Sequence, residues 1–238
     1  MMNLFLFLIV AFAVMSRSFA TNATGGLQGI DFKGLFTPDM AKCFSQGGVS
    51  FFISSGYYKG VDTNVCPSLT NAKNANIPNR DVYMMPVAYG YSKRASEQID
   101  EVVNYLKGNC QSDWSGRVWI NVQTIPPPNY VGNDVTKNRA FYQELVDTCT
   151  SKGYICGVFA VPGLWDDIFG STTFSYGVGS LPLWYQDTNN QANFNYYVPF
   201  GGYATPYVHQ YYNTNKACSQ SWDYGVTFYN NYAATYAF

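Results

Sequence analysis

The chain has a single histidine among 238 residues, and charged residues make up only 12% of it. With His209 as its one imidazole, the sequence excludes a zinc or iron site that needs several histidines, and any Ser-His-Asp triad would have to use that ring. The 14 Lys and Arg nearly balance the 15 Asp and Glu, so no basic field attracts phosphates. We therefore expect no nucleic acid partner, no metal and no cofactor.

Long apolar runs are also missing after the first twenty residues. Residues 4–14 are almost unbroken apolar sequence, and Ser18-Phe19-Ala20 places small residues where a signal peptidase cuts. The run is too short for a comfortable membrane span. We interpret residues 1–20 as a signal peptide and expect no membrane span in the mature chain. The predicted location is secreted, either extracellular or in the lumen of an endolysosomal compartment.

Aromatic residues, by contrast, reach 18% of the chain, which indicates a packed globular protein rather than a disordered one. Secretion would expose the cysteines to an oxidising compartment, where up to three disulfides are expected. No pair has the C-x-x-C spacing of metal sites, and the pairing stays open. The six cysteines are Cys43, Cys66, Cys110, Cys149, Cys156 and Cys218.

Short apolar segments alternate with helical patterns along the mature chain. Strands are predicted where β-branched and aromatic runs end at turn residues, and helices where apolar residues recur at helical spacing. The predicted strands are Gly29–Phe32, Val49–Ile53, Asp81–Met85, Arg117–Gln123, Tyr154–Ala160, Leu181–Tyr185, Tyr207–Tyr211 and Val226–Phe228. The predicted helices begin at Thr37-Pro38 and otherwise cover Ser68–Asn76, Ala95–Leu106, Asp134–Ser151 and Leu164–Phe169.

This order of elements favours an α/β fold. We predict a single irregular TIM-like barrel, with five β/α units followed by three strands that largely lack helices. No change in composition marks a linker, so residues 21–238 are expected to form one domain. A monomer is the expected state.

The carboxyl ends of the strands converge on one rim of such a barrel, and this rule selects the candidate site. The polar residues at these ends are Asp31, Asp62, Asn121, Gln123 and Asp187. Aromatic residues fall near the same predicted rim, namely Tyr57, Tyr58, Tyr83, Trp184 and Tyr185. Core packing is the commonest role of any one aromatic residue, but several at one rim favour a carbohydrate ligand, because sugar rings stack on aromatic faces.

Eight short motifs follow one another in a fixed order from about residue 28 to residue 228. They are GIDF (29–32), KGVDTN (59–64), NAKNANI (71–77), DVYMMP (81–86), VWINVQ (118–123), LPLWY (181–185), FGGYATP (200–206) and QYY (210–212). In this order and spacing the chain resembles the glycoside hydrolase family 25 lysozymes, in the branch found in nematodes, amoebae and other eukaryotes that feed on microbes. The resemblance implies cleavage of the glycosidic bond after N-acetylmuramic acid in bacterial peptidoglycan.

Three positions depart from the pattern that the resemblance implies. The catalytic strand of the family ends in Asp-x-Glu, with Glu as general acid and Asp acting on the acetamido group of the substrate; here these positions are Asn121 and Gln123. The first-strand aspartate is kept as Asp31, whereas the arginine after the second strand is Ser55. An amide neither releases a proton near neutral pH nor carries a negative charge, so muramidase activity by the usual route is not expected.

Three hypotheses therefore stay open. The first is a secreted lysozyme-like protein that binds bacterial cell-wall peptidoglycan or a related glycan, with weak or no muramidase activity. The second is an active lysozyme in antibacterial defence or digestion, which uses Asp31 and another carboxylate. The third is a non-catalytic structural or signalling subunit. The candidate catalytic positions are Asp31, Asn121 and Gln123, and the candidate substrate-binding residues are Asp62, Tyr57, Tyr83, Trp184, Tyr185, Asp187 and Gln210.

Overall fold

The protein folds into a closed barrel of eight strands that follow one another in chain order. This architecture comes from a computed structural model, which describes residues 26–88, 91–123, 134–212, 218 and 225–229. Strands β1 to β7 are parallel, while β8 is antiparallel to both of its neighbours, β7 and β1. The strands are β1 (Leu27–Phe32), β2 (Phe51–Tyr58), β3 (Asn79–Met85), β4 (Arg117–Val122), β5 (Ile155–Ala160), β6 (Leu183–Gln186), β7 (Val208–Tyr212) and β8 (Gly225–Tyr229).

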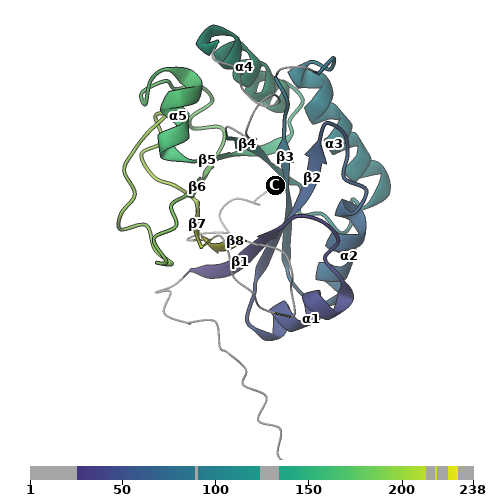
Figure 1. Ribbon diagram of the computed structural model, residues 1–238. Coiled ribbons are helices and arrows are strands. Elements are labelled where there is room, and N and C mark those ends of the chain that lie inside the picture. Colours follow the sequence, from purple (N-terminus) through teal and green to yellow (C-terminus); the bar gives the residue numbers. More distant parts are fainter. Residues whose placement is uncertain (1–25, 89–90, 124–133, 213–217, 219–224, 230–238) are drawn as a thin grey trace, which may run out of the picture.

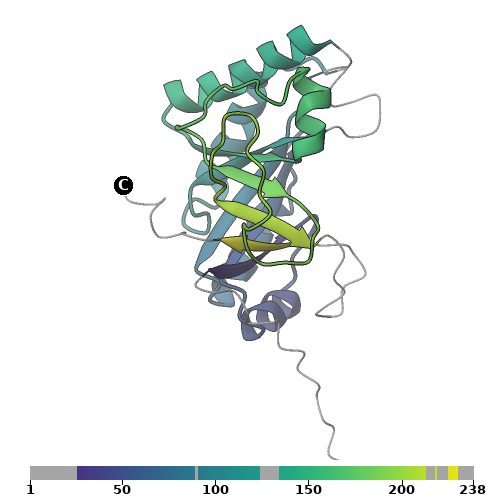
Figure 2. The same cartoon turned by 90° about the vertical axis from the view of Figure 1, so that its left-hand side faces the viewer.

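Helices cover only part of the barrel wall. Each of the strands β1 to β5 is followed by one helix, and the described residues after β6 contain none. Figure 1 shows α1 to α3 along the right of the barrel, α4 at the top and α5 at the upper left, and Figures 1 and 2 show long loops over the side formed by β6 and β7. This arrangement confirms the predicted barrel of five β/α units followed by three strands. The helices are α1 (Pro38–Gln46), α2 (Val65–Asn74), α3 (Ala95–Asn109), α4 (Val135–Ser151) and α5 (Pro162–Phe169).

Local sequence signals explain where the helices begin and which way they face. Thr37 caps α1 by accepting a hydrogen bond from the backbone N–H of Met40, and Pro38 occupies the first turn. On α3 the apolar residues at helical spacing are at most 1% exposed, so they form the face that packs on the barrel. These residues are Ile99, Val102, Val103 and Leu106.

Large aromatic side chains fill the interior of the barrel. One buried cluster inside the barrel includes Phe51, Trp119, Phe159 and Trp184. A second cluster lies between the strands and the helices and loops outside them, the outer layer. Trp119 fits because the neighbouring strand has a glycine beside it: a Cβ on Gly157 would lie 2.4 Å from the indole ring. The barrel interior is therefore a packed core, and a ligand would bind where the parallel strands end.

Strand β2 is longer than predicted and contains a bulge. The sequence pattern predicts Val49–Ile53, whereas β2 continues to Tyr58, and its register against β3 shifts between Ser55 and Tyr57. Gly56 lies in this bulge, where a Cβ would be 2.2 Å from a side chain of β3. The extra residue reverses the alternation of side chains, so Tyr57 points away from the interior.

All six cysteines are paired, which confirms the expected disulfides. One disulfide joins the end of α4 to the start of β5, one joins α2 to the residue after α3, and one joins α1 to the chain between β7 and β8. The pairs are Cys149–Cys156, Cys66–Cys110 and Cys43–Cys218. Because the last pair spans 175 residues, it links the first helix to the strands that close the barrel.

The predicted signal peptide, residues 1–20, lies outside the described residues. Within the part that is described, none of the helices combines the length and the apolar character needed to cross a membrane. The described residues from 26 onward form the barrel and its helices.

Candidate functional site

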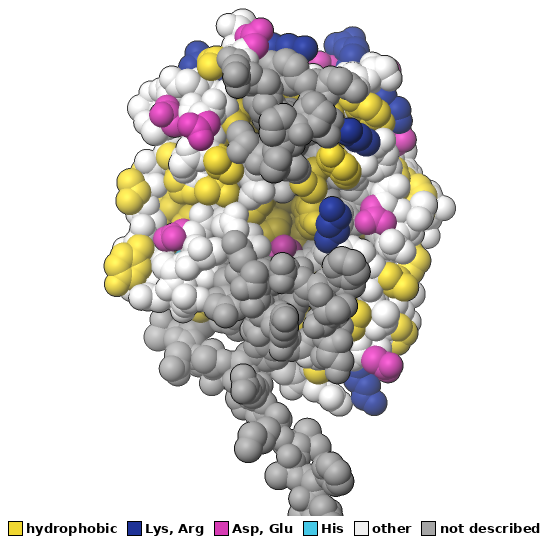
Figure 3. Space-filling view, in the orientation of Figure 1, with side chains coloured by type: hydrophobic (Ala, Val, Ile, Leu, Met, Phe, Trp, Pro, Cys, Tyr) yellow, Lys and Arg dark blue, Asp and Glu magenta, His cyan; other side chains and the backbone are white. Residues whose placement is uncertain are grey.

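The parallel strands end at one face of the barrel, which we call the mouth. Side chains along each strand point alternately to the interior and to the outer layer, so only every second residue can face the mouth. Figure 3 looks on to this face and shows a hollow with hydrophobic side chains inside it and an acidic side chain at its lower edge. The interior-facing polar residues at this end, which we call the mouth residues, are Asp31, Ser55, Tyr83, Asn121, Gln123, Gln186 and Gln210.

The end of β4 brings two amides to the mouth. Asn121 is 5% exposed and pairs in register with Phe159 of the interior cluster. Gln123, one residue beyond β4, donates a hydrogen bond from Nε2 to Oε1 of Gln186 at 3.0 Å. Two buried polar atoms, Oδ1 of Asn121 and Nε1 of Trp184, have no hydrogen-bond partner among the described residues. A bound ligand could satisfy this acceptor and this donor.

Asp31 is the carboxylate among the mouth residues. It lies in β1 and is half-buried. Its Oδ1 accepts a hydrogen bond from Nε2 of Gln210 on β7 at 3.1 Å, although the two residues are 179 positions apart in the sequence. This bond fixes the orientation of the carboxylate across the seam where β8 closes the barrel.

Tyr83 on β3 is a phenol that faces the barrel interior. It pairs in register with Ser55 of β2, the residue at the position of the family's arginine. Burial raises the pKa of Tyr83, and the negative charges of Asp31 and Asp62 raise it further, while the hydrogen bond with Ser55 opposes them. The phenol therefore stays protonated and can donate a hydrogen bond. Asp31 and Asp62 both lie near enough to act on it electrostatically.

The other predicted carboxylates, Asp62 and Asp187, lie in loops that follow β2 and β6. Asp62 accepts a hydrogen bond from the backbone N–H of Asn64 at 3.0 Å, and Asp187 accepts one from Nδ2 of Asn189 at 3.0 Å. These are local turn contacts, and no hydrogen bond within the described residues links either carboxylate to the amides of β4. Nowhere in the described ranges do three His, Cys, Asp or Glu side chains gather as metal ligands.

The aromatic residues predicted at the rim divide between the two sides of the barrel wall. Tyr83 and Trp184 face the interior. Tyr57 and Tyr185 are fully buried in the outer cluster, so the expectation that their rings face a sugar is corrected. The bulge turns Tyr57 outward, where its hydroxyl donates to Glu101 on α3. Tyr185 is outward because Trp184, the residue before it, is inward.

One mouth residue, Gln186, is missing from the sequence prediction. The predicted strand ends at Tyr185, whereas β6 includes Gln186. Alternation from the inward Trp184 identifies residue 186 as the next interior position, and this signal was present in the sequence. Gln210, a candidate substrate-binding residue, lies at the mouth, where it donates a hydrogen bond to Asp31.

His209 lies behind the mouth, in the outer layer. Its ring is fully buried and stacks on Tyr185, with centroids 4.4 Å apart. Nδ1 lies 2.6 Å from the carbonyl oxygen of Asn193, and Nε2 lies 2.8 Å from that of Asp187. Burial lowers the pKa of His209, although both carbonyl contacts oppose this shift. These contacts agree with a packing role for this histidine.

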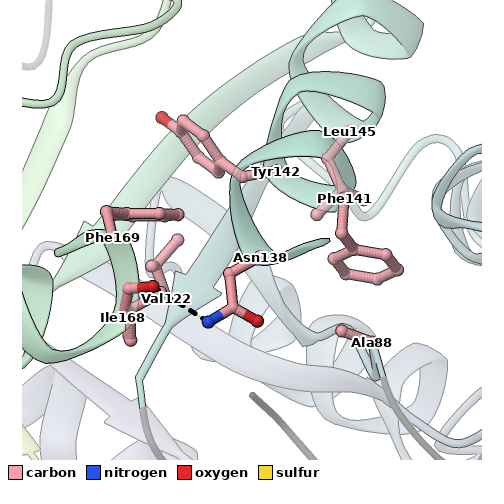
Figure 4. A pocket seen from close by; sticks show the side chains of 8 residues that line it. All are labelled: Ala88, Val122, Asn138, Phe141, Tyr142, Leu145, Ile168 and Phe169. Carbon is pink, nitrogen blue, oxygen red and sulfur yellow. Dashed lines mark hydrogen bonds between the residues drawn. The ribbon is translucent and has the colours of Figure 1, made fainter. Parts of the chain in front are cut away.

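An apolar cavity lies between α4, α5 and the end of β4 (Figure 4). Asn138 is its polar residue, and its Nδ2 donates to the carbonyl oxygen of Ile168 at 2.9 Å, which joins α4 to α5. The other lining residues include Val122, Phe141 and Phe169. Because the lining contains no carboxylate, the cavity supplies no acid or base for hydrolysis.

Comparisons with known proteins agree on one family. Residues 22–211 match the family model described as Lys-1, Lysozyme-like protein 1. The chain is 29% identical over 221 residues to "Probable GH family 25 lysozyme 2" of Dictyostelium discoideum, which covers 92% of this chain and 97% of that protein. It is 26% identical over 208 residues to "Lysozyme-like protein 5" of Caenorhabditis elegans, covering 86% and 93%. The fold is similar to the bacterial lysozyme from Streptomyces coelicolor, with a TM-score of 0.64, 19% identity and coverage of 90% and 96%.

Proposed function

The chain belongs to the glycoside hydrolase family 25 lysozyme-like proteins, and from this premise we propose that it is a secreted protein that binds the glycan of bacterial peptidoglycan, or a related glycan, with weak or no muramidase activity. The family match and the structural likeness to a bacterial lysozyme support the choice of glycan. The observation that carries the proposal is the end of β4, where Asn121 and Gln123 supply amides to the mouth.

Hydrolysis of a glycosidic bond needs a proton donor for the leaving oxygen and a negative group near the anomeric carbon. Neither Asn121 nor Gln123 meets these needs, because an amide has no proton to release near neutral pH and no charge. Gln123 is bonded to another amide, Gln186, rather than to a carboxylate. Losing general acid catalysis alone lowers the rate by about 10² to 10⁴.

The same side chains are suited to binding. Within the described part of the chain, Oδ1 of Asn121 is an acceptor without a partner and Nε1 of Trp184 is a donor without one. The protonated hydroxyl of Tyr83 lies on the same interior face. Hydroxyl and acetamido groups of a glycan both donate and accept hydrogen bonds, so they can pair with these atoms. Neutral amides also cost less to desolvate than carboxylates would.

The test measures binding and cleavage in the same tube. Purified protein is incubated with insoluble peptidoglycan, and both the sedimented protein and the released reducing ends are measured. We expect binding without turnover, and about fivefold weaker binding for Asn121→Ala, which removes one hydrogen-bonding group. Asn109→Ala, on the exposed face of α3, is the matched control and should bind like the wild type. Clear turnover that Asp31→Asn abolishes would contradict the proposal.

An active lysozyme is the second candidate, and one observation favours it. Asp31 lies in β1, and the backbone N–H of Asp62 donates to the carbonyl oxygen of Gly56 in the neighbouring β2, so two carboxylates come from adjacent strands on one side of the barrel. Lysis of a sensitive bacterium, measured from about pH 4 to about pH 8, distinguishes this candidate. Lysis above background that is lost in both Asp31→Asn and Asp62→Asn would favour it. A folded protein that neither lyses bacteria nor binds glycan would instead favour a structural or signalling subunit.

Secretion is the remaining part of the proposal. Three disulfides support maturation in an oxidising compartment, and residues 1–20 have the pattern of a signal peptide. Expression of the full chain in eukaryotic cells tests this directly. The protein recovered from the medium should begin at Thr21, and retention of an uncleaved chain inside the cells would contradict the assignment.

A further inference from the structure

A second surface lies on the rim beside the mouth, where β1 and β2 end. Tyr58 is 38% exposed and Leu35 is 44% exposed. The Nζ atoms of Lys33 and Lys59, both exposed residues, lie 6.0 Å and 5.7 Å from the centre of the Tyr58 ring. We call Lys33, Leu35, Tyr58 and Lys59 the rim patch. Lys33 follows Asp31 by two residues, so the patch adjoins the mouth.

Within the described residues, the lysines of the rim patch take part in no ion pair. The ion pairs of the described residues use Lys73, Lys93, Arg94 and Lys152. Lys33 and Lys59 form no ion pair in the same part of the chain, although the whole chain has a net charge of −1. The rim therefore presents two exposed ammonium groups, which form no ion pair within the described residues, beside a mouth whose own carboxylate is Asp31.

The backbone holds Lys59 in a conformation that lysine rarely adopts. Its φ is +56°, in the left-handed region that favours glycine or asparagine. The turn is closed by a hydrogen bond from the N–H of Tyr58 to the carbonyl oxygen of Gly60 at 2.9 Å. The hydroxyl of Tyr91 also donates to the carbonyl oxygen of Lys59 at 2.7 Å. These backbone contacts hold Lys59 at the exposed rim, beside the ring of Tyr58.

We propose that the rim patch binds carboxylate groups of the peptidoglycan strand whose sugars occupy the mouth. Peptidoglycan carries carboxylates on the peptides attached to its sugars, and ammonium groups pair with carboxylates. The exposed parts of Tyr58 and Leu35 offer apolar surface to a sugar face beside these charges. This inference rests on the proposed function and adds selectivity for an anionic glycan over a neutral one.

The first test compares two glycans and two double variants. Lys33→Gln with Lys59→Asn removes both charges of the patch, and Lys42→Gln with Lys107→Gln removes two exposed charges from α1 and α3. Binding to insoluble peptidoglycan should weaken about fivefold for the patch variant and stay unchanged for the control. Binding to chitin, a neutral polymer, should be the same for all three proteins. Raising the salt from about 20 mM to about 500 mM should remove the preference of the wild type for peptidoglycan.

The second test identifies the anionic group. Peptidoglycan whose carboxylates have been converted to amides should bind the wild type as weakly as untreated peptidoglycan binds the patch variant. Wall material stripped of phosphate polymers should bind like untreated peptidoglycan. Loss of binding on phosphate removal, with no effect of amidation, would assign the patch to phosphate and overturn the carboxylate proposal.

A stability measurement separates lost binding from lost folding. Asparagine tolerates a positive φ better than lysine, so Lys59→Asn should keep or raise the urea midpoint of unfolding while it weakens binding. A patch variant that folds and binds peptidoglycan like the wild type would overturn the inference and leave the proposed function intact. A wild type that binds neither polymer would overturn both.

Discussion

The two sides of the barrel mouth differ in charge. The side formed by β1 to β3 carries Asp31, Asp62 and the lysines of the rim patch, whereas the interior-facing polar groups from β4 and β6 are the amides Asn121, Gln123 and Gln186. A glycosidase places carboxyl groups on both sides of the bond that it cleaves. Among the described residues, the interior-facing polar groups of one side are amides while the barrel is complete, so the fold does not by itself fix the charge at the mouth.

The largest expected effect comes from removing the disulfide that ties the β1–β3 side to the chain between β7 and β8. Cys43–Cys218 joins α1 to the chain between β7 and β8 over 175 residues, whereas Cys149–Cys156 closes a separation of 7 residues. Replacing both cysteines of the long-range pair by alanine should lower the free energy of unfolding by about 5 kcal/mol, against about 2 kcal/mol for the short-range pair. Urea unfolding measures both losses. Equal losses would mean that chain entropy does not set these contributions.

The next largest effect is expected from variants that replace the amides of β4 by carboxyl groups. Asn121→Asp with Gln123→Glu supplies a charge and a proton donor at the end of β4, so release of reducing ends from peptidoglycan should rise by about 10² over the wild type. The single variant Asn121→Asp, with Gln123 unchanged, has the charge but no proton donor. Its release of reducing ends should stay near background.

The outcome of this experiment decides what β4 contributes. A double variant that folds and binds peptidoglycan yet releases no reducing ends would show that the amide positions do not face the reacting bond. In that case the difference between the two sides would concern binding alone.

Much of the barrel follows from the sequence because its signals are local. Apolar spacing such as Ile99 to Leu106 fixes the buried face of α3, and Thr37-Pro38 fixes the start of α1. The bulge in β2 has no comparable signal, since it depends on how Gly56 fits against β3. The sequence therefore predicts the strand but not the direction of Tyr57.

The candidate site shows the same division. Placing Asp31, Asn121 and Gln123 at the strand ends needs only the order of the strands, and the structure has these residues there. The bonds from Gln210 to Asp31 and from Gln123 to Gln186 join residues 179 and 63 positions apart. Such pairs depend on how the barrel closes, which no local pattern encodes.

A smaller effect on the free energy of unfolding is expected when one hydrogen bond is removed from each side. Gln210 donates to the carboxylate of Asp31, while Gln123 donates to the neutral amide of Gln186. Hydrogen bonds to charged groups are the stronger kind, so Gln210→Met should lower the free energy of unfolding by about 2 kcal/mol and Gln123→Met by about 1 kcal/mol. Urea unfolding of the two variants measures the difference. The reverse order would contradict the assignment of charge to one side.

The smallest effect concerns His209, on the loop-covered side behind the mouth. Burial lowers its pKa below the ordinary 6.5, against the opposing effects of the Asp187 and Asn193 carbonyls and the charge of Asp187; Tyr185 and Tyr211 also pack near the ring. Between the lowered pKa and 6.5 the unfolded chain binds more protons than the folded one, so the free energy of unfolding falls as the pH drops through this window. Above this window the contribution of the neutral ring to stability is complete.

His209→Gln cannot take up this proton, so the stability difference between wild type and variant should shrink from about pH 7.5 to about pH 5 in thermal melts. A difference that grows on acidification would mean that the folded protein holds His209 protonated, with both ring nitrogens donating to the two carbonyls.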